Sequence, residues 1–211
     1  MFFAIDDQQQ RRAKSPHELT MINLLLFNLL IGVALLGGSM AQPDSLIAVY
    51  KWFGVALPLA LSLAVILFTW ARAARAPRTE PWFVAAHWRL SASRYRALLA
   101  AYVISAAVVS LAFFGGNEHA ELERRIAALP PAMQEMERHK LNSQDMGSAI
   151  WARIGVVPLL LTVMGLIMLE SGALYQAGRG EVPDSLVARL PPPPSLAGSE
   201  QPLVAPADNE G

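Results

Sequence analysis

Four runs without a charged side chain constrain this chain more than any other feature. They contain 16 to 20 residues each and lie at 21–40, 52–70, 97–116 and 154–169. A helix rises about 1.5 Å per residue, so twenty residues match the roughly 30 Å hydrocarbon thickness of a bilayer. Each run therefore predicts a membrane-spanning helix. Allowing for interfacial residues, we place the spans at about 19–40, 46–70, 97–116 and 150–170.

The composition agrees with this interpretation. Apolar residues make up 54% of the chain and charged residues 16%, which is unusual for a water-soluble protein of 211 residues. There is no cysteine, so disulfides, thiolate metal sites and cysteine nucleophiles are excluded. The formal net charge is zero, so the overall charge does not favour binding to nucleic acid. We predict an all-α integral membrane protein, a bundle of four transmembrane helices whose main partner is the lipid bilayer.

The charges between the runs are segregated by sign. The connection 71–96 carries six arginines and a single acid, whereas the connection 117–149 carries six acids and four bases. Because basic loops stay in the cytoplasm, we expect 71–96 to be the inner loop and 117–149 the outer loop. Four spans then place both chain ends in the cytoplasm. We expect a multi-pass protein of a bacterial inner membrane.

Sequence signals indicate where the membrane domain begins and ends. Ser15, Pro16 and Glu18 occupy the positions of an N-cap, a first helical residue and a capping-box glutamate. They predict a membrane domain over 16–177, preceded by a cytoplasmic tail over 1–15. The segment 178–211 is rich in proline and lacks apolar periodicity, so we predict a disordered cytoplasmic tail.

An alternative for the first span is a cleaved signal peptide. Ser39, Met40 and Ala41 form a small-x-small site after an apolar run that follows basic residues. The run is longer than a usual signal-peptide core, and a twenty-residue basic region before it is uncommon. We expect a retained helix, with cleavage at Ala41 as the alternative.

The inner loop predicts a short amphipathic helix that begins after Thr79 and lies along the membrane surface. Its aromatic and arginine side chains suit anionic headgroups or a partner protein. The predicted lipid or partner contacts are Trp82, Phe83, Trp88, Arg89, Arg94 and Arg96.

The outer loop predicts a helical hairpin. Pro130 and Pro131 divide it into helices over 118–129 and about 132–141. Two pairs within it have metal-ligand spacing, and they are His119 with Glu123 and Glu135 with His139. Exposed charged helices give such pairs by chance, so we assign no metal, no cofactor and no catalytic residue.

No ionisable side chain lies near the centre of a predicted span, and no histidine lies within one. This pattern argues against a haem site and against a proton relay in the membrane. Candidate polar contacts between spans are Asn23, Asn28 and Thr162.

These observations favour a non-catalytic structural or assembly subunit of a larger envelope complex, such as a secretion, conjugation or respiratory machine. Its partners would be other membrane subunits or copies of itself. The alternative is a small oligomeric transporter or channel subunit with a polar path past Asn23, Asn28 and Thr162. The third hypothesis is a membrane enzyme that uses His119 or His139 at the outer surface.

Overall fold

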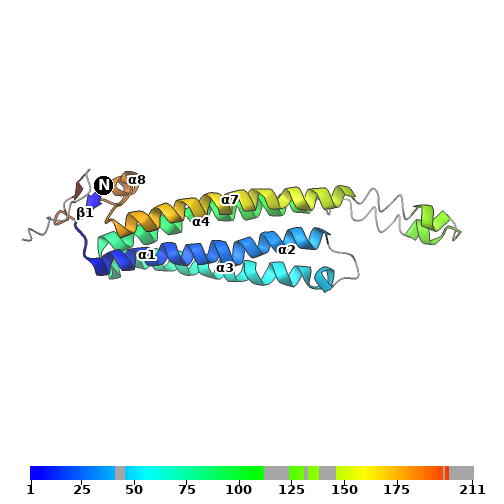
Figure 1. Ribbon diagram of the computed structural model, residues 1–211, viewed down its shortest axis with the longest axis horizontal. Coiled ribbons are helices and arrows are strands. Elements are labelled where there is room, and N and C mark those ends of the chain that lie inside the picture. The colour runs from blue at the N-terminus through cyan, green and yellow to red at the C-terminus, as the bar shows by residue number, and fades with distance from the viewer. Residues whose placement is uncertain (41–45, 112–123, 131–132, 138–145, 197, 200–211) are drawn as a thin grey trace, which may run out of the picture. The chain divides into compact units, whose positions relative to one another are not determined.

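A computed structural model describes residues 1–40, 46–111, 124–130, 133–137, 146–196 and 198–199. The described chain is mostly helical (Figure 1). The elements in order are β1 (Phe2–Phe3), α1 (Asp7–Ile22), the π-helical segment η1 (Asn23–Asn28), α2 (Leu29–Met40), α3 (Leu46–Thr79), α4 (Trp82–Leu111), α7 (Met146–Gly178), α8 (Asp184–Arg189) and β2 (Gly198–Ser199). Short helical turns also lie at 124–127 and 133–137.

Four helices are long and apolar enough to cross a membrane. They extend over Asp7–Gly38, Trp52–Thr79, Trp82–Ser110 and Arg153–Gly178. This confirms the predicted helical fold with four apolar helices and indicates membrane association. Within the helices, large apolar side chains face outward, including Leu67 at 63% exposed and Val103 at 69%. Such surfaces suit contact with lipid, which replaces the core as their apolar environment.

The chain divides into two compact units. Unit 1 contains Met1–Asn28, Leu59–Arg96 and the described part of Met164–Gly211. It has a core of small and aromatic residues, among them Ala76, Ala86, Phe83 and Trp88. Unit 2 contains Leu29–Pro58 and the described part of Ala97–Val163. In unit 2, Gly155 of α7 lies so close to α4 that an added Cβ would be 2.5 Å from Val109 Cγ2.

The first helix begins nine residues before the predicted start at Pro16. The Asp6 carboxylate accepts a hydrogen bond of 2.6 Å from the backbone N–H of Gln9 and thereby caps the helix at Asp7. Pro16 lies inside α1 and is buried. Residues 7–15 are therefore helical, because Asp6 caps a helix that begins before Ser15.

The inner loop does not form a separate helix. α4 continues without a break from Trp82 to Leu111, and it includes both the predicted surface helix and the third apolar run. Phe83 is 1% exposed and Trp88 is 6% exposed, so these rings are part of the core of unit 1. Thr79 ends α3, where its hydroxyl donates to the Arg75 carbonyl at 3.3 Å.

The beginning of the predicted disordered tail is folded. Val182 is fully buried, and its N–H donates to the Met1 carbonyl at 2.9 Å. β2 pairs with β1, with Phe2 opposite Ser199. Gly180 has φ +70°, and an added Cβ would be 2.6 Å from the Phe3 carbonyl oxygen, so this turn requires glycine. Burial of Val182 therefore stabilises a segment that composition alone assigns to disorder.

Two predictions fall largely outside the described residues. Ala41, the alternative cleavage site, is one of these positions. The outer hairpin is described only over 124–130 and 133–137, and His119, Glu123 and His139 lie outside these ranges.

The close approach at Gly155 generates a prediction. We expect Gly155→Ala to lower stability by about 1–3 kcal/mol, because the new methyl group overlaps Val109, whose χ1 is stiff. Thermal unfolding of the detergent-solubilised protein should show a midpoint several degrees lower. Gly165→Ala is the matched control, since no atom lies within 4 Å of its added Cβ. Equal shifts in both variants would contradict the assigned packing.

Candidate functional site

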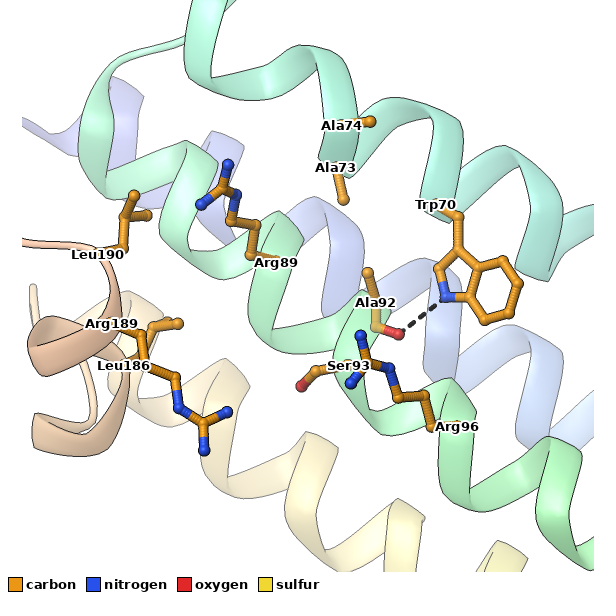
Figure 2. A pocket seen from close by; sticks show the side chains of 10 residues that line it. All are labelled: Trp70, Ala73, Ala74, Arg89, Ala92, Ser93, Arg96, Leu186, Arg189 and Leu190. Carbon is orange, nitrogen blue, oxygen red and sulfur yellow. Dashed lines mark hydrogen bonds between the residues drawn. The ribbon is translucent and has the colours of Figure 1, made fainter.

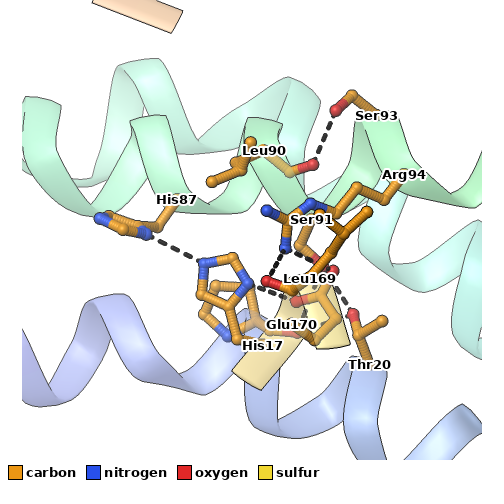
Figure 3. A network of polar contacts seen from close by, with 10 residues as sticks. His17, Thr20, His87, Leu90, Ser91, Ser93, Arg94, Leu169 and Glu170 are labelled. Atoms are coloured by element: carbon orange, nitrogen blue, oxygen red, sulfur yellow. Dashed lines mark hydrogen bonds and ion pairs between the residues drawn. The ribbon is translucent and has the colours of Figure 1, made fainter. Parts of the chain in front are cut away.

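A cluster of ionisable side chains lies inside unit 1. His17 of α1, His87 of α4 and Glu170 of α7 are each 0% exposed. Arg94 of α4 is the fourth member of the group (Figure 3). Burial of His17, His87 and Glu170 is costly unless neighbouring groups compensate them, and Arg94 is partly buried beside them. This cluster, named here the His–Glu network, is therefore the leading candidate for a functional or structural centre.

His17 is the central residue of the network. Its Nδ1 lies 2.5 Å from Glu170 Oε2, and its Nε2 lies 2.9 Å from His87 Nδ1. The Nδ1 atom donates to the carboxylate, since a carboxylate only accepts. Nε2 then accepts from His87 when His17 is neutral and donates when His17 is protonated. One imidazole thus joins α1 to both α4 and α7.

Arg94 also contacts the Glu170 carboxylate and supplies a positive charge. Arg94 Nη1 lies 3.1 Å from Glu170 Oε1, and the same nitrogen donates to the Leu169 carbonyl at 2.9 Å. The hydrogen-bond geometry favours the carbonyl, so the contact with Oε1 is an ion pair. Arg94 and His17 together compensate the buried carboxylate.

Two further pairs extend the contact between α1 and α4. The Thr20 and Ser91 hydroxyls are 2.6 Å apart, and Asn23 Nδ2 donates to the Tyr95 hydroxyl at 3.3 Å. With His17 and His87, these pairs form three successive rungs, named here the polar ladder. Residue numbers rise together along both helices, so α1 and α4 run parallel.

The π-helical segment η1 follows the ladder directly. Within it, Asn28 Nδ2 donates to the Asn23 carbonyl at 2.9 Å, and it also lies 3.1 Å from Ser62 Oγ on α3. Widened π turns leave backbone carbonyls available to side chains and recur at functional positions. Here the widened turn allows an asparagine to connect α1 with α3.

The residues predicted from sequence as polar or partner contacts lie in different environments. Asn23 and Asn28 are fully buried and bonded as described, and Thr162 is half-buried in α7 within unit 2. Of the aromatic and arginine set, Trp82 donates its Nε1–H to the Leu190 carbonyl at 3.2 Å, and Arg94 belongs to the His–Glu network. Arg89 and Arg96 are exposed.

Arg89 and Arg96 line a pocket of about 530 Å³ together with Arg189 of α8 and Trp70 of α3 (Figure 2). We name it the arginine pocket. A second, smaller charge group lies elsewhere in unit 1, where the Glu80 carboxylate accepts from both Arg12 and Arg72. Glu80 is thus compensated by residues outside the arginine pocket.

Sequence reasoning missed the His–Glu network. The predicted elements separate these residues, because position 17 falls at the start of the first helix, position 87 in a loop helix and position 170 at the end of the fourth span. One signal was present, since His87, Ser91 and Tyr95 recur every four residues on one helix face. Within the described residues, no group of three or more histidine, cysteine or acidic side chains could hold a metal ion.

Comparison of the chain with protein-family models, with curated proteins and with solved structures gives no match.

The first prediction from this site concerns Glu170. We expect Glu170→Gln to destabilise the protein by about 1.5–3 kcal/mol, because it removes the charge that His17 bonds and leaves the partly buried Arg94 without a counter-charge. Thermal unfolding in detergent measures the loss. The control is Glu18→Gln, which removes the same charge from an exposed position on α1. A variant as stable as the control would show that the network contributes nothing to stability.

The polar ladder generates a second prediction. We expect a double-mutant cycle of Thr20→Val and Ser91→Ala to give a coupling energy of about 1 kcal/mol, because the hydroxyls bond each other. Chemical denaturation of the four proteins provides the cycle. Replacing Ser91→Ala with Ser93→Ala gives the matched control, since the Ser93 hydroxyl donates to the Leu90 carbonyl. Coupling in the control cycle but not in the first would refute the ladder.

Proposed function

We propose that this chain is a non-catalytic, multi-pass subunit with a structural or assembly role in a larger envelope complex of the bacterial inner membrane. Secretion, conjugation and respiratory machines are the classes that such a subunit fits. In this proposal the chain supplies a rigid helical unit to which neighbouring subunits attach, and both of its ends are cytoplasmic.

The polar ladder carries this proposal. His17, Thr20, Asn23 and Asn28 form the buried polar face of the first helix, and each bonds to a side chain on another helix. Bonds between buried polar groups fix helix register and rotation. A unit with a fixed register suits a scaffold, whose surfaces must keep their geometry while partners bind.

The same bonds weigh against the transport alternative. A conduction path needs polar groups that can exchange their partners with a passing solute. Asn23, Asn28 and Thr162 are the candidates for such a path. The amides of Asn23 and Asn28 bond to Tyr95 and Ser62, and both asparagines are fully buried. Rotating these side chains toward a solute would break their bonds to Tyr95 and Ser62.

The exposure of side chains supports a location for the proposed partner surface. Phe83 and Trp88 pack inside unit 1, so their rings are occupied by the chain's own core. Met133 and Met136 in the outer loop are 47% and 63% exposed. Flexible methionine side chains adapt well to protein surfaces. We therefore assign partner binding to the outer loop.

Native purification tests the proposed function. We expect the protein, extracted in mild detergent, to bring other membrane proteins with it in fixed stoichiometry, as measured by sizing and mass spectrometry. Deleting 118–141 should remove these partners, whereas deleting 200–211 should not. A homogeneous homo-oligomer without partners would overturn the subunit role and favour transport.

The proposed orientation can be tested because the chain has no cysteine. Six arginines and one acid in 71–96 support a cytoplasmic location for that segment. We expect Arg78→Cys to resist a membrane-impermeant maleimide in intact spheroplasts and to react after lysis. Met136→Cys should react in both conditions. The reverse pattern would invert the topology.

A further inference from the structure

We propose that the arginine pocket binds the phosphate headgroup of an anionic phospholipid. The pocket lies within unit 1, between α3, α4 and α8, and its volume is about 530 Å³. Nothing in the proposed subunit role requires this site, and it would remain if that role proved wrong.

Three arginines provide the charge. Arg89 and Arg96 are seven residues apart on α4, which places them on one helix face two turns apart. Arg189 reaches the pocket from α8 (Figure 2). All three are exposed, and among the described residues no acidic side chain forms an ion pair with them. The pocket therefore carries positive charge that the described fold does not neutralise.

No acid of the described chain lines the pocket, and three acids of unit 1 pair with other cations. Glu80 pairs with Arg12 and Arg72, and Glu170 pairs with Arg94 and His17. Asp184, in the first turn of α8, lies 2.8 Å from the Met1 ammonium group. An external anion is consequently the natural counter-charge for the arginine pocket. Guanidinium groups match phosphate oxygens in a bidentate geometry.

The other side of the pocket is apolar. Trp70 lines it, and its indole Nε1–H donates to the Ala92 carbonyl at 2.9 Å, which fixes the orientation of the ring. Leu186 and Leu190 of α8 line it as well. A site that combines guanidinium groups with an indole and two leucines suits an amphipathic ligand better than a free anion.

The surface of α3 continues from the pocket toward the apolar run. Trp70 is the last residue of the uncharged run 52–70, and Leu63, Leu67, Trp70 and Ala74 recur at helical spacing on one face. Leu63 and Leu67 are 38% and 63% exposed. An acyl chain can therefore lie along α3 while its phosphate reaches the arginines at the level where headgroups begin.

Lipid binding by the full-length protein in detergent tests this site. Native mass spectrometry would count bound phosphatidylglycerol and cardiolipin, with phosphatidylcholine as the neutral lipid. We expect anionic lipid to bind in preference. Replacing Arg89, Arg96 and Arg189 by glutamine should weaken binding roughly 100-fold, about fivefold for each arginine.

The matched control replaces Arg11, Arg75 and Arg78 by glutamine. These side chains are exposed in unit 1 and do not line the pocket. Their substitution removes the same charge as the first triple variant. Binding should be unchanged in this variant. An equal loss in both triple variants, or equal binding of phosphatidylcholine, would overturn the proposal. Displacement of the lipid by inorganic phosphate alone would also overturn it, because the ligand would then be a soluble anion.

A second variant makes the test independent of charge. We expect Leu67→Gln to reduce lipid binding severalfold, since it places a polar group under the acyl chain, and to leave binding of inorganic phosphate unchanged. Thermal unfolding of each variant establishes that it is folded. Unaltered lipid binding in folded Leu67→Gln would exclude the acyl-chain path along α3.

Discussion

A carboxylate that water cannot reach needs compensation from the protein, and Glu170 imposes this requirement on unit 1. Its partners come from two other helices, since His17 belongs to α1 and Arg94 to α4. The carboxylate is compensated only when α1, α4 and α7 are correctly rotated. The alanines of the surrounding core, such as Ala13 and Ala86, let the helices come close enough for these contacts.

The polar ladder determines the register of the first helix relative to α4. Its rungs advance by three residues from α1 into the start of η1, from His17 to Thr20 to Asn23, and by four residues on α4. Both steps keep side chains on one face of a helix. Since the helices run parallel, a shift of one turn would break all three rungs at once. Register is thus determined by several bonds that fail together.

The sequence predicted the four apolar helices because a run without charge is a local property. It did not predict where the helices begin and end, since those limits depend on contacts with distant residues. Beginning the first helix at Pro16 placed His17 at the start of that helix, and separating 79–96 from the third span placed His87 on a short loop helix. Their pairing needs two continuous helices, and Glu170 is explained only after both are present. The arginine pocket needs α8, which composition assigned to a disordered tail.

The distance along the chain between the partners of the His–Glu network determines the order in which they can meet. His17 precedes His87 by 70 residues and Glu170 by 153 residues. At roughly 5–20 residues per second, ribosomes make the carboxylate about 8–30 s after the imidazole. α4 is made within this interval, since His87 follows His17 by less than half of the distance to Glu170. The contacts of α1 with α4 therefore form first, and unit 1 is completed only when the last apolar helix has entered the membrane.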